Sequence, residues 1–148
     1  MILDTETTDL FGHVVQIGIV DLQGRTLMNT LVRPPAAITD EATAIHGLDD
    51  AAVAAAPSLS ALAPVLLELT AGRQVLAYNA SYDRQVLVDG LIAAGVDPGH
   101  LHERRRWSCL MRARARHDGL GWVKLDGPHD ALGDCRAALQ VLRTLAAS

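Results

Sequence analysis

The sequence has few cysteines, few aromatic residues and no long hydrophobic run. Its 148 residues include two cysteines, Cys109 and Cys135, and neither lies in a paired Cys or His spacing. Two cysteines are too few for a disulfide framework, so we expect both to be small core residues of a protein in a reducing cytoplasm. Aromatic residues make up 3% of the chain, which argues against a protein that reads nucleic-acid bases mainly by stacking.

Hydrophobic stretches are interrupted by Arg, Asp, Glu or Pro before they reach the length that crosses a bilayer. The first residues also lack the basic start and the apolar run of a signal peptide, so we expect neither membrane insertion nor secretion. With 49% hydrophobic residues, a chain of this length is expected to fold as one domain, residues 1–148, around a single core.

The net charge of −4 argues against a basic protein that coats nucleic acid over its whole surface. Six of the 13 basic residues are nevertheless concentrated in one stretch: Arg104, Arg105, Arg106, Arg112, Arg114 and Arg116. Two interpretations of this stretch stay open. It is either the solvated face of a helix or, beside an active site that takes an anionic polymer, a surface that holds phosphates.

The pattern along the chain predicts a mixed β-sheet covered by helices. Strands are expected over residues 1–5, 14–21, 26–33 and 74–78, with the first three joined as an antiparallel meander. Helices are expected over residues 39–46, 58–70, 81–94, 107–117 and from 129 or 130 to 146. Because a helical crossover precedes the last strand, parallel strands join the meander, and the chain is of the α/β class with helices on both faces.

The first strand is expected to be short, since only Met1, Ile2 and Leu3 precede Asp4. Three residues are few for a strand at the centre of a sheet. Either the strand is trimmed in this protein or the start codon is placed late. We expect any site that depends on this strand to be held least firmly there.

Two carboxylates, Asp4 and Glu6, follow this apolar start. Residues i and i+2 of a strand point to the same face, so the two side chains should lie side by side at the end of a buried strand. Like charges in such a place repel each other and lose hydration, and they need a counter-charge. A hard divalent cation such as Mg²⁺ fits, because it prefers carboxylate oxygens. A metal site is therefore predicted here.

Two further segments contain carboxylates that could complete this metal site. Residues 78–83 span the end of a strand and the first turn of a helix, and residues 129–134 span a loop and the start of the last helix. If that helix begins near His129, Asp134 lies just over one turn inside it, and His129 stays on the lip. Four carboxylates and a lip histidine are the groups that two-metal phosphodiester cleavage requires.

These segments resemble the motifs of the DEDDh, or DnaQ-like, 3′–5′ exonucleases, which include RNase T and the proofreading subunit of bacterial DNA polymerase III. The resemblance covers essentially the whole chain. Residues 4–8 match the first motif, residues 79–83 the second and residues 129–134 the third, and residues 44–48 resemble a further short family segment. Two positions depart from the family pattern: Asp9 stands where Gly is frequent, and Tyr78 where His is common.

The resemblance implies a ribonuclease H-like fold and a single DEDDh exonuclease domain. It implies two Mg²⁺ or Mn²⁺ ions, held by the carboxylates of Asp4, Glu6, Asp83 and Asp134. His129 would act as the general base. The reaction implied is hydrolysis at the 3′ ends of DNA or RNA, with release of nucleoside 5′-monophosphates.

Substrate contacts are implied for five further residues: Thr7, Leu10, His46, Asn79 and Tyr82. A structural interpretation of His46 stays open beside this one. The partners implied are single-stranded or frayed 3′ ends of DNA or RNA, a DNA polymerase and a second copy of the chain.

Alternatives to these interpretations also stay open. Asp83 by itself would be an acid favoured by the start of a helix, and Asp134 by itself could pair with Arg136 or Arg143. Trp107 and Trp122 are expected in the core or at its rim. The same fold could serve as a catalytically weak nucleic-acid-binding or polymerase-accessory module, or it could act on short oligonucleotides and small phosphodiesters.

Overall fold

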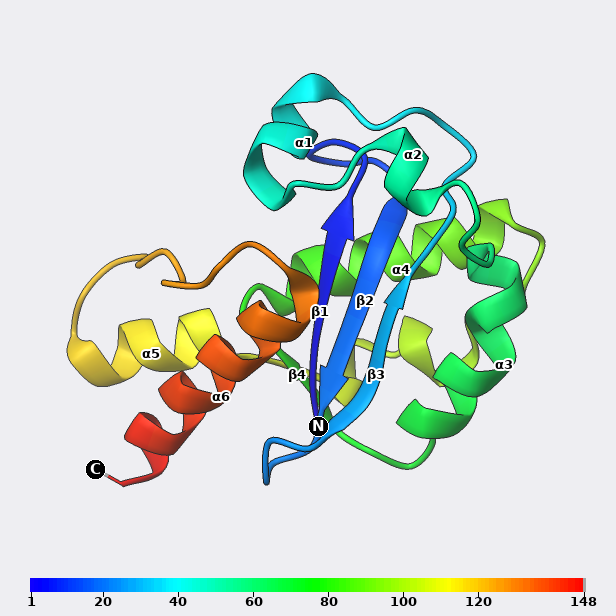
Figure 1. Ribbon diagram of the computed structural model, residues 1–148. Helices are drawn as coiled ribbons and strands as arrows, with labels where there is room; N and C mark the ends of the chain where they lie inside the picture. The colour runs from blue at the N-terminus through cyan, green and yellow to red at the C-terminus, as the bar shows by residue number, and fades with distance from the viewer. Residues whose placement is uncertain (148) are drawn as a thin grey trace.

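The computed structural model describes residues 1–147, which form a five-stranded sheet with helices on both faces (Figure 1). The strands are β1 (Ile2–Thr7), β2 (Val14–Val20), β3 (Thr26–Leu31), β4 (Val75–Ala77) and β5 (Trp107–Cys109). The helices are α1 (Asp40–His46), α2 (Asp50–Val53), α3 (Leu59–Thr70), α4 (Ala80–Ala93), α5 (Leu110–Asp118) and α6 (Ala131–Ala146). Two 3₁₀ turns, η1 (Gly99–His102) and η2 (Arg104–Arg106), precede β5.

The strand order β3-β2-β1-β4-β5 places β1 at the centre of the sheet. β1, β2 and β3 form the predicted antiparallel meander, while β4 runs parallel to β1 and β5 runs parallel to β4. The expected mixed sheet is therefore confirmed. All six residues of β1 pair with β2, from Ile2 opposite Val20 to Thr7 opposite Val14. The strand thus continues past Glu6 instead of ending at the carboxylates.

Two hydrophobic clusters lie on opposite faces of the sheet, because side chains alternate along each strand. Leu3 and Ile17 belong to the cluster that packs against α3 and α4. Ile2 and Val20 belong to the cluster that packs against α5 and α6, which also contains the fully buried Cys135. Even-numbered residues of β1 therefore face α6.

Gly18 of β2 lies opposite Asp4 and allows α6 to approach the sheet closely. A Cβ at this position would lie 2.5 Å from the backbone of Ala131, the first residue of α6. On the same face of β2, the side-chain oxygen of Gln16 accepts a hydrogen bond from the Ala131 N–H at 3.1 Å. The start of α6 is thereby fixed against the face of the sheet that carries Asp4 and Glu6.

One predicted element is wrong in part. The pattern predicts a helix from Trp107, but residues 107–109 form the edge strand β5, and α5 begins at Leu110. The cause is tertiary, since these three residues pair with β4. The Trp107 indole packs against the α3 and α4 cluster and donates its N–H to the carbonyl of Leu101 at 2.9 Å. The interpretation of Trp107 as a core or rim residue is confirmed.

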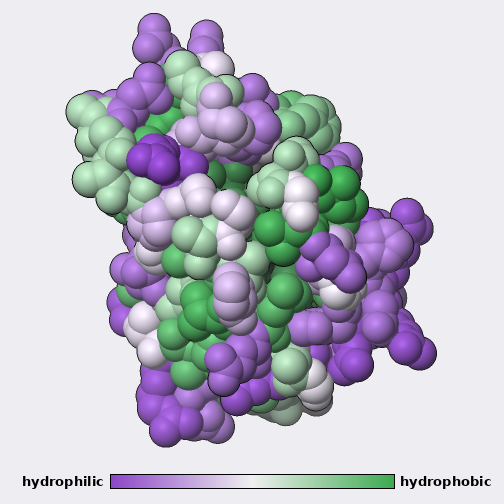
Figure 2. All heavy atoms as spheres, turned by 90° about the vertical axis from the view of Figure 1, so that its right-hand side faces the viewer, coloured by the Kyte–Doolittle hydropathy of each residue, from purple (hydrophilic) through white to green (hydrophobic). Residues whose placement is uncertain are grey.

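The face of the molecule on the α3 side is drawn in Figure 2. Hydrophobic surface runs down the middle of this face, and hydrophilic side chains border it. Among the large hydrophobic side chains that are exposed in residues 1–147, Val65 belongs to α3 and Ile92 to α4. None of the helices in this part of the chain combines the length and the hydrophobicity that a bilayer-crossing helix needs.

Candidate active site

A cavity of about 330 Å³ lies where the second half of β1 meets the starts of α4 and α6. Eight of the ten predicted site residues line it: Asp4, Glu6, Leu10, Asn79, Tyr82, Asp83, His129 and Asp134. The two others, Thr7 and His46, do not. The fold therefore brings the three acidic motifs together in one place.

Asp4, Glu6 and Asp134 form a tight group within this cavity. Each offers one carboxylate oxygen, and these oxygens all lie within 4.8 Å of one another. Alternation along β1 places Asp4 beside Glu6, as predicted, and Asp134 reaches them from the beginning of α6. Carboxylate oxygens at this spacing suit a shared divalent cation.

Asp83 lines the same cavity, but one of its oxygens is bonded to the protein. Thr5 donates to Asp83 Oδ1 twice, from its backbone N–H at 3.1 Å and from its hydroxyl at 3.0 Å. The Asp83 side chain is buried in the first turn of α4. Asp83 Oδ2 takes part in neither of these two hydrogen bonds.

Burial raises the pKa values of all four carboxyl groups, and the charges of neighbouring carboxylates raise them further. Removal from water is the largest cause at Asp4, whose pKa lies well above its ordinary range, and the charge of Asp83 is the next cause. Burial raises the pKa of Glu6 to about 8 and that of Asp83 to about 7. It also raises the pKa of Asp134. Within residues 1–147 no Lys or Arg forms an ion pair with these groups, so their charge is left for a cation to neutralise.

His129 lies at the edge of the cavity, directly before the N-cap of α6. Its φ of 59° is in the left-handed region, where histidine is several-fold enriched over most residues. The His129 N–H donates to Asp134 Oδ1 at 3.3 Å, so one turn positions both side chains. Lys124 Nζ lies 3.4 Å from His129 Nε2. Because an ammonium group only donates, this ring nitrogen is the acceptor.

The loop of residues 119–130, orange in Figure 1, covers one side of the cavity. The buried Tyr78, which follows β4, donates from its hydroxyl to the carbonyl of Val123 at 2.6 Å. The neighbours of Val123, Trp122 and Lys124, both line the cavity, and 69% of the Trp122 surface is exposed. Trp122 is thus a rim residue, and Tyr78, a departure from the family pattern, fixes the loop that carries it.

Thr7 and His46 lie outside the lining of the cavity. The Leu48 N–H donates to His46 Nδ1 at 3.1 Å, and His46 Nε2 is 3.1 Å from the Thr7 carbonyl. With Nδ1 accepting, Nε2 carries the proton and donates to Thr7. The Thr7 and Tyr82 hydroxyls are 2.7 Å apart. The structural interpretation of His46 accounts for both ring nitrogens, while substrate contacts by Thr7 and His46 stay predictions.

Three residues that position the site are absent from the predicted set. Thr5 orients Asp83, and Gln16 holds the start of α6. Gly127 passes so close to Asp134 that a Cβ there would collide with Oδ1. The sequence could have indicated a role for Gln16, because it is the one hydrogen-bonding side chain in the otherwise apolar β2 and needs a partner there. Its partner in α6 is distant in sequence and carries no corresponding signal.

Comparisons with known proteins agree with this geometry. Residues 1–142 match the exonuclease family represented by RNase T. The chain is 32% identical to the uncharacterized exonuclease CP81 of Escherichia phage 186, over 97% of this chain and 86% of that protein. It is 35% identical to exodeoxyribonuclease 10 of Escherichia coli K12, over 78% of this chain and 46% of that protein. The chain thus spans less than half the length of this second relative.

The fold is shared with a solved nuclease structure, that of exonuclease X in complex with 5′-overhanging duplex DNA. The TM-score is 0.70 at 31% identity, over 97% of this chain and 90% of that one. The ribonuclease H-like fold expected from the motifs is therefore confirmed. The chain belongs to the RNase T family of exonucleases and is a DnaQ-like nuclease.

Proposed function

We propose that the protein is a divalent-metal-dependent 3′–5′ exonuclease that releases nucleoside 5′-monophosphates from the 3′ ends of single-stranded DNA. The observation that carries the proposal is the group formed by Asp4, Glu6 and Asp134, whose oxygens lie within 4.8 Å of one another in a cavity shared with Asp83 and His129. DNA is favoured over RNA because exodeoxyribonuclease 10 and a DNA-bound exonuclease are among the similar proteins.

The four carboxylates would hold two Mg²⁺ or Mn²⁺ ions. The donor set fits such ions, since it offers clustered carboxylate oxygens with which no Lys or Arg in residues 1–147 forms an ion pair. Asp83 would contribute through Oδ2, because Thr5 occupies Oδ1. When bound, the ions supply Lewis acidity toward the scissile phosphodiester and neutralise the negative charge that develops during its cleavage.

His129 would accept the proton of the attacking water. Imidazole is the side chain that most often does so, and Nε2 of His129 is the unprotonated nitrogen when it accepts from Lys124. Lys124 lines the same cavity, so an entering phosphate would take over its ammonium group. This exchange would free Nε2 for the water.

The terminal nucleotide would be seated by the residues around the carboxylates. Leu10 is 73% exposed and lines the cavity, and so do the Tyr82 ring and the Asn79 amide. Trp122 lies on the loop that covers another side. These groups offer an apolar surface for a base and an amide for a sugar or phosphate.

Three wider expectations belong to the same proposal. A DNA polymerase partner and a homodimer follow from the family resemblance alone. A place in the cytoplasm is in keeping with Cys109 and Cys135, which are both free thiols.

Digestion of 5′-labelled oligonucleotides tests the proposed function. In Mg²⁺ or Mn²⁺ the protein should shorten the strand stepwise from its 3′ end, and a chelator should stop the reaction. Single-stranded DNA, duplex DNA with a mismatched 3′ end and RNA are digested in parallel, with single-stranded DNA expected to be the fastest substrate. The Asp4→Asn variant serves as the inactive control. Degradation at the same rate by this variant would contradict the proposal.

A further inference from the structure

A second cavity, of about 700 Å³, lies between the start of α4, the edge strand β5 and α5. Four arginines line it: Arg84 from α4, Arg104 from η2, and Arg112 and Arg116 from α5. No Asp or Glu of residues 1–147 lines it. We call this cavity the arginine groove. A concave surface with four guanidinium groups and no carboxylate attracts anions.

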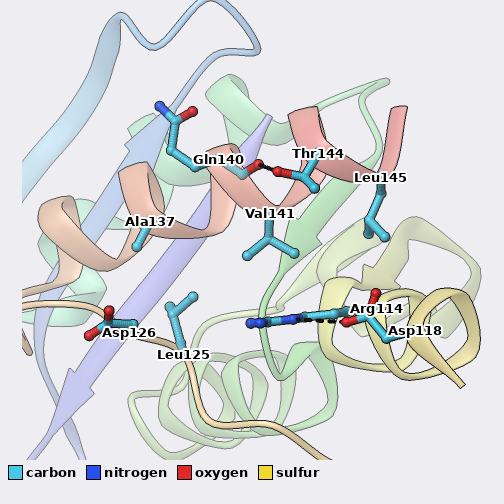
Figure 3. Close-up of a pocket in the computed structure, with 9 residues that line it drawn as sticks. All are labelled: Arg114, Asp118, Leu125, Asp126, Ala137, Gln140, Val141, Thr144 and Leu145. Carbon is cyan, nitrogen blue, oxygen red and sulfur yellow. Dashed lines mark hydrogen bonds and ion pairs between the residues drawn. The ribbon is translucent and has the colours of Figure 1, made fainter. Parts of the chain in front are cut away.

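Salt bridges divide the arginines of this region into two groups. Arg105 and Arg106 both pair with Glu103, at 2.9 and 3.5 Å. Arg114 pairs with Asp118 at 3.4 Å, and Figure 3 shows both side chains in a different cavity, below α6. The arginines of the groove form no ion pair with any residue between 1 and 147. Their charge is therefore available to a ligand.

The arginine groove adjoins the active-site cavity at two places in the chain. At the turn from β4 to α4, Asn79 lines the active-site cavity, and the next residue, Ala80, lines the groove. At the start of α5, Leu110 lines the groove, and the next residue, Met111, lines the active-site cavity. Consecutive residues thus line the two cavities at both places, and a strand whose 3′ end enters the active site would reach the groove next.

We infer that the arginine groove binds the phosphate backbone of the substrate strand on the 5′ side of the scissile bond. The inference rests on the proposed exonuclease function. Guanidinium groups suit this role, because their planar fork matches the geometry of phosphate oxygens. Contacts to the backbone carry no sequence information, so the groove would hold strands of any sequence.

This inference also decides between the two interpretations of the arginine-rich stretch. Three of its six residues, Arg104, Arg112 and Arg116, line the groove and would hold phosphates. The other three are paired with acids on the protein itself. Arg84, from a distant part of the chain, joins the groove only through the fold.

The test compares two double variants that remove equal charge from the same stretch. Arg112→Ala/Arg116→Ala alters the groove, and Arg105→Ala/Arg106→Ala alters residues paired with Glu103. Both are made with Asp4→Asn so that the strand stays intact, and binding of fluorescent single-stranded DNA and RNA is measured over a range of salt. The groove variant should bind both about tenfold more weakly, and the slope of log Kd against log salt should fall by about 1.4, or about 0.7 per lost phosphate contact. The control should bind as the protein without these changes does.

A second measurement separates this inference from the proposed function. Without the Asp4→Asn change, the p-nitrophenyl ester of thymidine 5′-monophosphate reports on the active site alone, because it has no upstream phosphates. In the groove variant the rate on long strands, relative to the rate on this ester, should fall about tenfold. If the unaltered protein hydrolyses neither the ester nor an oligonucleotide, the proposed function fails. If the ester is hydrolysed and the groove variant keeps the salt slope and affinity of the control, the groove inference fails.

Discussion

The imidazole and the backbone N–H of His129 contact different partners in this site. The backbone N–H bonds to Asp134, whereas the ring contacts Lys124. In a His129→Ala variant, kcat should therefore fall by about 10²- to 10⁴-fold, as for loss of a general base. The affinity for Mn²⁺, measured by calorimetric titration, should stay the same because the carboxylates are intact. A large loss of Mn²⁺ affinity would make His129 a metal ligand instead.

The left-handed backbone of His129 calls for a control in that experiment. Alanine is less favourable than glycine at a φ of 59°, so part of any effect of His129→Ala could come from the turn. A His129→Gly variant keeps this backbone without strain. Equal losses of kcat in both variants would assign the effect to the missing imidazole.

The site residues that can be predicted from the sequence are those whose positions follow from a local pattern. Asp4 and Glu6 are two positions apart in a strand, and alternation alone places them side by side. The double hydrogen bond from Thr5 to Asp83 joins residues 78 positions apart, and only the assembled sheet and α4 create it. Motif resemblance supplies Asp83 and Asp134, while the orientation of their oxygens depends on neighbours in space.

The approach of α6 to the sheet depends on Gly18, and this dependence can be tested. A Gly18→Ala substitution should push the backbone of Ala131 outward, because the new Cβ would lie 2.5 Å from it. Overpacking of this kind costs about 1–3 kcal/mol of unfolding free energy, and Asp134 should shift with the helix. Denaturant unfolding and kcat measure the two effects. Gly121→Ala is the matched control, since no heavy atom lies within 4 Å of a Cβ there.

The loop of residues 119–130 is expected to depend on Tyr78. A Tyr78→Phe variant loses the hydrogen bond to the Val123 carbonyl, at a cost of about 1 kcal/mol. Hydrogen exchange at residues 119–130 should accelerate, and KM should rise more than kcat falls, because Trp122 and Lys124 line the cavity from this loop. Unchanged exchange in the loop would show that other contacts hold it.

Elements were predictable where their pattern is local and periodic. The meander follows from β-branched runs separated by turns, and α4 and α6 follow from apolar spacing and their ends. Residues 107–109 differ, since they become a strand only by pairing with β4, about thirty residues earlier in the chain. In the sequence, the helical pattern of α5 extends back over residues 107–109, so the local pattern predicts a helix where the structure has a strand.

The stability of the metal-free molecule should fall as pH rises through the pKa values of its site. The folded-state pKa values of Glu6, about 8, and Asp83, about 7, exceed the ordinary values of 4.5 and 3.8. Between these limits the folded protein binds more protons than the unfolded one, so the free energy of unfolding decreases with rising pH. Thermal unfolding in chelator from about pH 5 to pH 8 should show a falling Tm.

Mn²⁺ should reduce this fall, because bound ions replace the protons that the folded site holds. Asp4→Asn, which removes one of the repelling charges, should lessen the fall in chelator and weaken the response to Mn²⁺. A metal-free Tm that rises over the same pH range would contradict the raised pKa values of Glu6 and Asp83.

Identification of the product formed in H₂¹⁸O tests the proposed 3′–5′ exonuclease activity. The site formed by Asp4, Glu6, Asp83, Asp134 and His129 is proposed to hydrolyse the 3′-terminal phosphodiester. In Mg²⁺ or Mn²⁺, mass spectrometry should find nucleoside 5′-monophosphates that carry one ¹⁸O in the phosphate, and none with Asp4→Asn. Nucleoside 3′-monophosphates, internal fragments, or equal release by the Asp4→Asn variant would contradict it.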